Sequence, residues 1–399
     1  MTRRKFMLIA GEPSGDLLAA ELVAELRAQL LAEGREAPEF VGAGGPQMAA
    51  AGVRLSIDLT RFAIIGLSDV LRNLWRLRGI LRQMLDLACS ERPDAVICVD
   101  YGGFNRRFAA AMRARQKPDW RPRLVQYVSP QVWASRPSRA RTLARDLDLL
   151  ISILPIEKPW YAARHPRLRV DFVGHPILDR HPAALGGSPE DLSPHGEDTS
   201  QPPRVLLLPG SRPSEIAHHW PVMVEAARLV HPNHPARWFA VFTNESLRDL
   251  ATRIDGGQGF PLETRVGGLD QELARATLAI AATGTVTLEC AVWRVPTLAI
   301  YKASWSTYQI ARRIIRVRHL AMPNLLADAP VMPELLQNEA SPVKLATAAG
   351  HLLANPAERA RIRAELGGVV RLLGQPGAAK RAAASILSLL PAAGCMTDF

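Results

Sequence analysis

The stretch VLLLPGSRPSEI, residues 205–216, joins a buried strand to a helix through a sharp turn. The apolar run 205–208 predicts the strand, and the Pro-Gly-Ser sequence at 209–211 ends it. Residues 213–215, Pro-Ser-Glu, are typical of the first turn of a helix. Backbone N–H groups at that helix start, with the guanidinium of Arg212 beside them, predict a site for an anion such as a phosphate. The alternative is an ordinary turn whose arginine faces solvent.

The same alternation of apolar runs and helical patterns continues along most of the chain, which predicts βαβ units and parallel sheets. The helical stretches include 17–32, 70–88 and 285–292. We therefore expect an α/β protein with two doubly wound Rossmann-like domains, whose cleft is the expected ligand site. The expected strands are residues 6–10, 40–43, 95–99, 124–128, 147–153, 171–173, 205–208, 238–243, 264–266, 278–281 and 297–301.

Composition changes divide the chain further. Residues 186–203 are rich in Gly, Ser, Pro, Asp, Glu and His without periodicity, which indicates a linker or insertion. We expect an N-terminal domain at 1–185 and a C-terminal domain at 204–340. Residues 341–399 have no strand signal, and we expect a helical tail that packs on the N-terminal domain or on a partner chain.

The 399-residue chain carries a formal net charge of +11, and its basic residues are concentrated. Sixteen Arg and one Lys stand against six acids between Arg61 and Arg145, and a second basic run spans 302–318. Such patches attract anionic lipids, phosphorylated molecules or nucleic acids. Nucleic acid is disfavoured because aromatic residues make up only 6% and no recognition motif is present. Four cysteines without CxxC spacing and no apolar run of spanning length favour a cytosolic protein.

Candidate catalytic groups of the first domain follow two expected strands. Glu12 and Ser14 lie in the GEPSGD loop at 11–16, where two glycines allow a ligand to approach the backbone. Asp100 directly follows the strand 95–99 and can act as a general base, with a pKa set by partial burial and by nearby Arg106 and Arg107. A plain βα loop and an Asx cap of the next helix are the alternatives.

The second domain repeats the strand–turn–helix pattern of the opening stretch at residues 281–289. Thr283, Gly284 and Thr285 form a small-residue turn at the start of a helix, and Glu289 lies one turn inside it. Backbone amides there can hold a diphosphate, and the carboxylate can accept hydrogen bonds from ribose hydroxyls. Two such turns in one half of the chain make a nucleotide site the leading hypothesis. Asp146-Leu147-Asp148 fits a DxD metal motif but lacks the carboxylate and His partners that a hard-cation site needs. The histidines at 218, 219, 231 and 234 have no metal-ligand spacing, and we expect them at the surface. We therefore expect no metal.

A basic amphipathic segment at residues 64–85 predicts a contact with anionic membrane. Its apolar residues alternate with arginines, and a tryptophan lies on the apolar face. The alternative is a helix packed on its own core with a solvated arginine face. The expected membrane-contact residues are Leu71, Leu74, Trp75, Arg76 and Arg78.

Taken together, the motifs resemble those of the lipid-A-disaccharide synthases, a family of inverting glycosyltransferases with the two-domain GT-B architecture. The resemblance runs from about residue 6 to residue 337 and follows the order of motifs in the family. The motifs are GEPSGD (11–16), DYGGFN (100–105), YVSPQVWA (127–134), FVGHP (172–176), LPGSRPSEI (208–216), ATGTVTLE (282–289), MPNLLAD (322–328) and PELLQ (333–337).

The resemblance implies transfer of 2,3-diacylglucosamine from a UDP donor to the 6-hydroxyl of 2,3-diacylglucosamine 1-phosphate, with no cofactor or metal. Asp100 then matches the base, and Glu12 and Ser14 match the loop that faces the reacting sugars. Arg212 matches the arginine near the donor diphosphate, and Glu289 the acid at the ribose. The implied nucleotide contacts also include Gly210, Ser211, Thr283, Gly284, Thr285, Asn324, Glu334 and Gln337.

The resemblance also implies a peripheral protein on the cytoplasmic face of the inner membrane, with a homodimer as one expectation. The sequence departs from the family pattern at Gly102, where Pro is common, and at Ser135, where a second Trp is usual. The alternatives are another GT-B UDP-sugar transferase, a UDP-N-acetylglucosamine epimerase, or a nucleotide-binding, membrane-associated protein without turnover.

Overall fold

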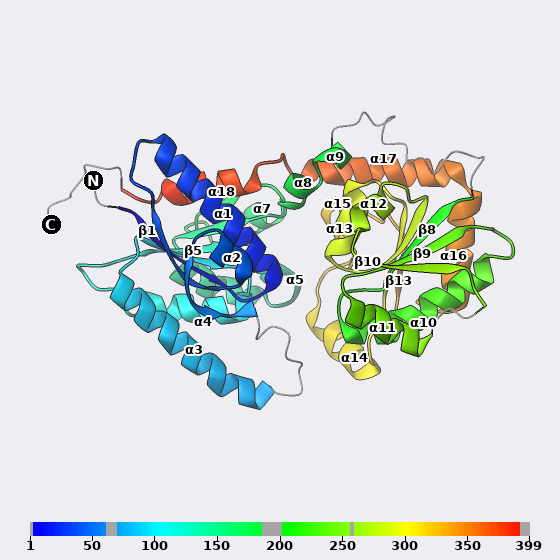
Figure 1. Ribbon diagram of the computed structural model, residues 1–399, viewed down its shortest axis with the longest axis horizontal. Helices are drawn as coiled ribbons and strands as arrows, with labels where there is room; N and C mark the ends of the chain where they lie inside the picture. Colours follow the sequence, from blue (N-terminus) through cyan, green and yellow to red (C-terminus); the bar gives the residue numbers. More distant parts are fainter. Residues whose placement is uncertain (1–2, 61–69, 186–201, 256–258, 392–399) are drawn as a thin grey trace. The chain divides into compact units, whose positions relative to one another are not determined.

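The computed structural model describes residues 3–60, 70–185, 202–255 and 259–391, with the side chains of 70–76, 306–307 and 310–311 omitted. The described chain forms two compact units (Figure 1). The first comprises residues 1–176 and 374–399, and the second comprises 177–373. The boundary therefore falls after Pro176 rather than after residue 185. The expected insertion at 186–203 lies almost entirely outside the described residues.

The first unit has a seven-stranded parallel sheet of order β3-β2-β1-β4-β5-β6-β7. Its strands are β1 (Lys5–Ala10), β2 (Glu39–Gly44), β3 (Arg54–Asp58), β4 (Ala95–Val99), β5 (Arg123–Tyr127), β6 (Leu149–Ser152) and β7 (Val170–Phe172). Its helices are α1 (Pro13–Ala32), α2 (Pro46–Ala50), α3 (Val70–Glu91), α4 (Gly102–Arg113), α5 (Val132–Ser135), η3 (Pro137–Arg139), α6 (Ala140–Asp146), α7 (Glu157–Ala162) and α18 (Ala378–Leu387).

Alternation along the strands builds a core on each face of this sheet. Phe6 and Leu8 of β1 belong to the core that α1 and α18 cover, whereas Met7 and Ile9 belong to the core on the other face. All four side chains are completely buried. Helices on both faces are what a parallel sheet requires, because its strands are apolar on both sides.

The second unit has a six-stranded parallel sheet of order β10-β9-β8-β11-β12-β13, the classical doubly wound order. Its strands are β8 (Arg204–Leu208), β9 (Arg237–Phe242), β10 (Leu262–Val266), β11 (Leu278–Ala282), β12 (Thr297–Tyr301) and β13 (Glu334–Leu336). Its helices are α8 (Ile177–Arg180), α9 (Pro182–Leu185), α10 (Pro213–Val230), α11 (Glu245–Ile254), α12 (Leu269–Leu273), α13 (Thr285–Val292), α14 (Trp305–Ile314), α15 (Met322–Ala327), α16 (Pro342–Ala354) and α17 (Pro356–Leu372).

The strand orders place the predicted loops after β1 and β4 and after β8 and β11 at the switch point of each sheet. In each sheet the chain direction across the sheet reverses between two central strands, β1 and β4 in one unit and β8 and β11 in the other. Ligands of open α/β sheets bind at this switch point, outside the carboxyl ends of the strands. The predicted α/β class with two doubly wound domains is confirmed, and its loops converge as expected within each unit.

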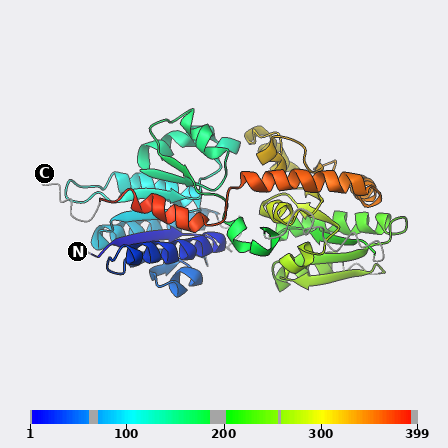
Figure 2. The same ribbon diagram turned by 90° about the horizontal axis from the view of Figure 1, so that it is seen from above.

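The C-terminal helices divide between the two units. α16 packs on α10, and α17 packs on α13, so both belong to the second unit. α18 lies beside α1 in the first unit (Figure 2). There the Nε2 of Gln29 donates to the carbonyl of Lys380 at 2.9 Å, and the Nε of Arg381 donates to the carbonyl of Val173 at 2.8 Å. Within the described residues, no helix is long and apolar enough to cross a membrane.

Candidate functional site

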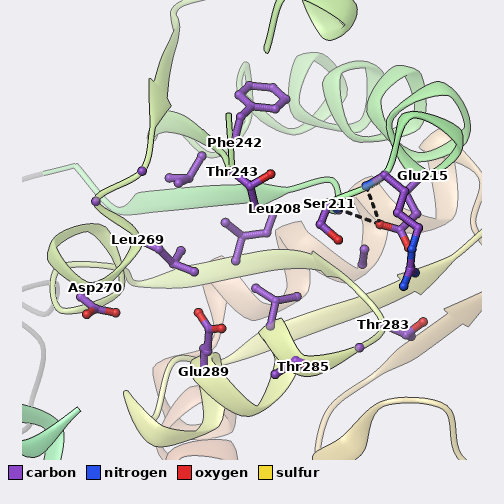
Figure 3. A pocket seen from close by; sticks show the side chains of 18 of the residues that line it. Leu208, Ser211, Glu215, Phe242, Thr243, Leu269, Asp270, Thr283, Thr285 and Glu289 are labelled. Atoms are coloured by element: carbon purple, nitrogen blue, oxygen red, sulfur yellow. Dashed lines mark hydrogen bonds and ion pairs between the residues drawn. The ribbon is translucent and has the colours of Figure 1, made fainter. Parts of the chain in front are cut away.

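A pocket of about 580 Å³ opens at the switch point of the second unit's sheet (Figure 3). Its volume falls within the range of small-molecule sites. The loops that follow β8, β9, β10 and β11 form its walls, so four successive strand ends contribute. The predicted nucleotide contacts that line it are Gly210, Ser211, Arg212, Thr283, Gly284, Thr285 and Glu289.

The turn after β8 already holds an anion, the carboxylate of Glu215. The backbone N–H groups of Ser211 and Arg212 donate to its Oε2 at 2.8 and 3.2 Å. The Nη1 of Arg212 donates to its Oε1 at 2.9 Å. These are the donors that the sequence predicts for a phosphate, and Figure 3 shows them converging on the carboxylate. The interaction is a capping box at the start of α10.

Gly210 is required by this arrangement. Its φ is 122°, in the region where side chains are strained, and a Cβ there would lie 2.4 Å from Oε2 of Glu215. Arg212 itself is 75% exposed and makes its ion pair through Nη1. Within the described residues Nε and Nη2 of Arg212 have no other polar contact, so they can bind a ligand in the pocket that Arg212 lines.

The turn after β11 forms the opposite wall. Gly284 caps α13 with a φ of 142°, and a Cβ there would meet no atom within 4 Å. Glu289 lies one turn along α13 and points into the pocket (Figure 3). Burial raises the pKa of Glu289 to about 7, the charge of Asp270 raises it, and Arg180 lowers it. The carboxyl is thus poised to change its charge near neutral pH.

Asp270 was not predicted as a site residue, although it lines the same pocket. It lies on α12, directly after Gly267, Gly268 and Leu269, and its Oδ1 is 3.2 Å from Nδ1 of His181. Gly267 and Gly268 both have positive φ, 72° and 68°. A glycine pair directly after a strand, followed by an acid, was the signal that could have indicated a third turn of this kind.

Asn324, Glu334 and Gln337 do not line this pocket, and their contact with the nucleotide stays a prediction. Asn324 is buried, and its Nδ2 donates to Oε1 of Glu334 at 2.7 Å, whereas Glu334 also accepts from the backbone N–H of Leu320 at 2.9 Å. Gln337 forms two hydrogen bonds with the backbone of Ala303, at 3.0 and 2.6 Å. These side chains fix the segments around β13, because their polar atoms are engaged within the unit.

His219 is buried, although we expected a surface histidine, and it connects two strand ends. Its Nδ1 lies 2.8 Å from the carbonyl oxygen of Pro209, and its Nε2 accepts from the backbone N–H of Lys302 at 3.0 Å. Pro209 offers only an acceptor and Lys302 only a donor, so the proton lies on Nδ1. Burial lowers the pKa of His219. The neutral ring therefore connects the turn after β8 to the segment after β12.

In the first unit, Asp100 sits in a strained corner after β4. Asp100 and Tyr101 have φ values of 49° and 45°, which are unusual for residues other than glycine. The carbonyl of Asp100 accepts from Nδ2 of Asn105 at 2.8 Å and from Nε2 of Gln126 at 3.0 Å. Both amides are buried. A Cβ at Gly11 would lie 2.3 Å from the Tyr101 ring, so the predicted first-domain loop meets Asp100 at this corner.

Burial raises the pKa of Asp100, and a backbone hydrogen bond from Tyr101 opposes the shift. Arg106 and Arg107 do not contribute, contrary to our expectation that they would set this pKa. Glu12 directly precedes α1 and Ser14 lies in its first turn, and both are exposed. The charge of Glu12 raises the pKa of Tyr101, which places Glu12 near the same corner.

The loop after β5 is anchored by a buried acid that the sequence reading missed. Glu157 accepts from Nε1 of Trp133 at 3.0 Å and from Oγ of Ser152 at 2.6 Å. Burial raises the pKa of Glu157 to about 7, and the bonds from Ser152 and Trp133 oppose the shift. Trp133 therefore has a fixed partner on its own unit. No single motif could have paired Trp133 with Glu157, because they are 24 residues apart in sequence.

The predicted membrane segment is only partly described. Residues 64–69 lie outside the described chain, and so do the side chains of Leu71, Leu74, Trp75 and Arg76. Farther along α3, Ile80, Met84 and Leu85 are buried in the core, while Arg78 is exposed. The C-terminal part of α3 thus packs on its own unit, as the alternative interpretation expects.

Comparison with protein families matches residues 6–386 to the lipid-A-disaccharide synthetase family. The lipid-A-disaccharide synthase of Anaeromyxobacter dehalogenans (strain 2CP-C) is 36% identical over 388 residues, covering 97% of each chain. That of Geobacter sulfurreducens is 35% identical over 400 residues, covering 98% of each.

Among solved structures, a putative UDP-N-acetylglucosamine 2-epimerase from Listeria monocytogenes superposes with a TM-score of 0.61 at 16% identity, covering 98% of this chain and 97% of the other. MurG of Acinetobacter baumannii gives 0.55 at 14% identity, covering 96% and 99%. At these identities the likeness shows the fold, which is that of GT-B glycosyltransferases and related epimerases.

Proposed function

The chain belongs to the lipid-A-disaccharide synthase family, and we infer from this how its two units divide the reaction. It is a glycosyltransferase of lipid A biosynthesis with the GT-B fold. The reaction we propose joins UDP-2,3-diacylglucosamine to the 6-hydroxyl of 2,3-diacylglucosamine 1-phosphate. Its products are a β-1,6-linked disaccharide 1-phosphate and UDP. The family match over nearly the whole chain is the observation that carries this proposal.

The second unit is proposed to bind the donor. Arg212 supplies charge-assisted hydrogen bonds to the diphosphate, and the turn at Gly284 and Thr285 supplies backbone donors from the opposite wall. The Glu289 carboxylate accepts from the ribose. Departure of UDP places negative charge on the diphosphate, and a preorganised cation there lowers the barrier. The pocket lined by these residues supports the assignment.

The first unit is proposed to activate the acceptor. Inversion by a single displacement needs one base on the face opposite the leaving group, and Asp100 is that base. It removes the proton of the 6-hydroxyl as the oxygen attacks the anomeric carbon, and UDP takes the bonding electrons. A carboxyl with a raised pKa is a stronger base once ionised. Glu12 and Ser14 are proposed to orient the sugars beside it.

The substrates of this proposal carry acyl chains, so the enzyme has to work at a membrane surface. We propose that residues 71–78 of α3, including Trp75, contact anionic lipid on the cytoplasmic face of the inner membrane. A homodimer is also proposed, on the family resemblance alone.

The experiment that tests the function is a UDP-release assay with both acylated sugars, run with and without EDTA. We expect release only when donor and acceptor are both present, and the same rate with EDTA. UDP-N-acetylglucosamine without an acyl chain is the control, and its conversion at a comparable rate would favour an epimerase or another transferase. No release under any condition would contradict the proposed reaction.

A further inference from the structure

Four arginines gather at the carboxyl edge of the first unit's sheet. Arg106 and Arg107 lie on α4, which follows β4, and Arg136 and Arg139 lie at η3, which follows β5. β4 and β5 are neighbouring parallel strands, so the segments after them meet at one edge. A Cβ built at Gly102 would lie 3.0 Å from Cβ of Pro130, which brings the start of α4 against the loop after β5.

Arg106, Arg107 and Arg136 are close enough to Arg139 for their charges to act on it. Burial lowers the pKa of Arg139, and the charges of Arg136, Arg106 and Arg107 lower it further. Holding like charges together at a partly buried position destabilises the free protein. Folding stability therefore does not explain why these four arginines lie together, and binding of an anion would.

No acid neutralises the cluster in the part of the chain that the structure describes, and its side chains make no ion pair there. The Nε of Arg106 is buried and has no hydrogen-bond partner. Other arginines of the same unit differ, because Arg113 pairs with Asp148 at 3.0 Å and Arg145 pairs with Asp146 at 2.7 Å. The four arginines thus differ from these in having no acid partner among the described residues, and Arg106 also has a buried donor without an acceptor.

We propose that Arg106, Arg107, Arg136 and Arg139 bind a phosphate monoester, the 1-phosphate of the acceptor sugar. The proposal rests on the proposed function, because it assigns the acceptor's charged group to the unit that carries Asp100. Asp100 directly follows β4 at the same sheet edge, so a sugar bound there reaches the base with one end and the arginines with the other. Arginine forks match phosphate oxygens in pairs, and several of them suit a dianion.

The test compares KM values while removing either an arginine of the cluster or the 1-phosphate of the acceptor. Arg139→Gln and Arg106→Gln are assayed with the acceptor 1-phosphate and with the same diacylglucosamine bearing a free 1-hydroxyl. For the wild type we expect the KM to be about tenfold or more lower with the phosphate, the effect of losing one charged hydrogen bond. In each variant we expect that preference to shrink at least about fivefold, on the same scale. Variants that keep the full preference would overturn the proposal.

Arg115→Gln is the matched control, because Arg115 is exposed beyond the C-terminal end of α4 and the substitution removes the same charge. We expect it to keep the wild-type preference. A phospholipid headgroup is the other source of a phosphate monoester or diester. If the variants lose binding to phosphatidylglycerol vesicles but keep the acceptor preference, the site serves the membrane and the acceptor assignment is wrong.

A second readout does not depend on turnover. Glucosamine 1-phosphate, which is water-soluble, should raise the Tm of the wild type and of Arg115→Gln more than that of Arg139→Gln. Without ligand, Arg139→Gln should melt no lower than the wild type, because it removes a repelling charge. An equal ligand-induced shift in all three proteins would contradict the proposal. If the wild type releases no UDP but shows the shift, the proposed function fails and the phosphate site stands.

Discussion

Arg212 is the residue proposed to bind the diphosphate of the UDP donor. Its ion pair with Glu215 limits the ways in which it can do so. Ser211 and Arg212 give their backbone N–H groups to Glu215, so a diphosphate either replaces that carboxylate or binds through the free edge of the guanidinium. Either route requires the planar fork of an arginine. The turn at Gly210 and the capping box fix the start of α10, and the exposed Arg212 side chain extends from this point along the pocket.

Replacing Arg212 should therefore weaken UDP binding. For Arg212→Ala we expect UDP to bind about 10- to 100-fold more weakly, the effect of removing hydrogen bonds between charged groups. Arg212→Lys should recover only part of this, because an ammonium cannot bind two phosphate oxygens in a plane. Calorimetric titration with UDP measures both. Arg248→Ala, an exposed arginine on α11 paired with Asp249, is the control, and an equal loss there would contradict the assignment.

Glu289 should make nucleotide binding depend on pH. Its pKa is raised to about 7, first by burial and then by Asp270. A carboxylate accepts from ribose hydroxyls and a protonated carboxyl does so less well, so UDP affinity should increase as the pH rises from 6 to 8. Glu289→Gln should remove this part of the pH dependence while keeping any that UDP itself contributes. If wild type and variant change in parallel, Glu289 does not titrate in the site.

At the scale of elements, His219 shows how one buried side chain connects two strand ends. It holds the turn after β8 to the segment after β12 through Pro209 and Lys302. Because burial lowers its pKa, the unfolded chain binds a proton more readily than the folded one, and stability falls as the pH drops below about 6.5.

We expect His219→Phe to lower the free energy of unfolding at pH 7.5 by about 1–3 kcal/mol, because the Pro209 carbonyl and the Lys302 amide lose their partner. The difference from wild type should shrink as the pH falls below about 6.5, because the wild type loses stability when its unfolded chain takes up a proton at His219 and the phenylalanine variant does not. Urea unfolding measures it. His218→Phe, one residue away on α10 and less buried, should change stability by less than about 0.5 kcal/mol. Equal losses in the two variants would contradict the bridging role.

Helix α3 has two parts with different roles in our account. Its C-terminal part is buried through Ile80, Met84 and Leu85. For the triple change of Leu71, Leu74 and Trp75 to Ser we expect loss of binding to anionic vesicles, with UDP affinity unchanged. Cosedimentation with vesicles measures it, and Leu229→Ser, which alters an exposed leucine of the second unit, is the control. Unchanged vesicle binding and unchanged activity in the triple variant would exclude the membrane contact.

The apolar elements could be predicted from the sequence, whereas two of the four edge strands could not. The strand expected at 95–99 and the helix expected at 285–292 match β4 and α13. β3 and β13 were not predicted, because both are edge strands without a continuous apolar run. Edge strands are half-exposed, so their sequences resemble loops.

At the scale of the whole molecule, each glycine turn could be predicted from the sequence. That the turns lie together could be known only from the order of the strands in the sheet. β8 lies beside β11, so the turns at Gly210 and Gly284, distant in sequence, line one pocket. The order of strands is set by tertiary packing and leaves no local signature. For the same reason motifs could not show three contacts: Glu215 accepting from the turn after β8, Glu157 accepting from Trp133, and the four arginines lying together.

Each unit is proposed to carry one half of the chemistry, with the base on the first and the leaving-group site on the second. UDP release by Asp100→Asn, compared with its UDP affinity, tests this most directly. We predict a fall in kcat of at least about 100-fold, the usual contribution of a general base, with UDP affinity within about twofold of wild type. Full UDP release by Asp100→Asn in the presence of both acylated sugars would contradict the account.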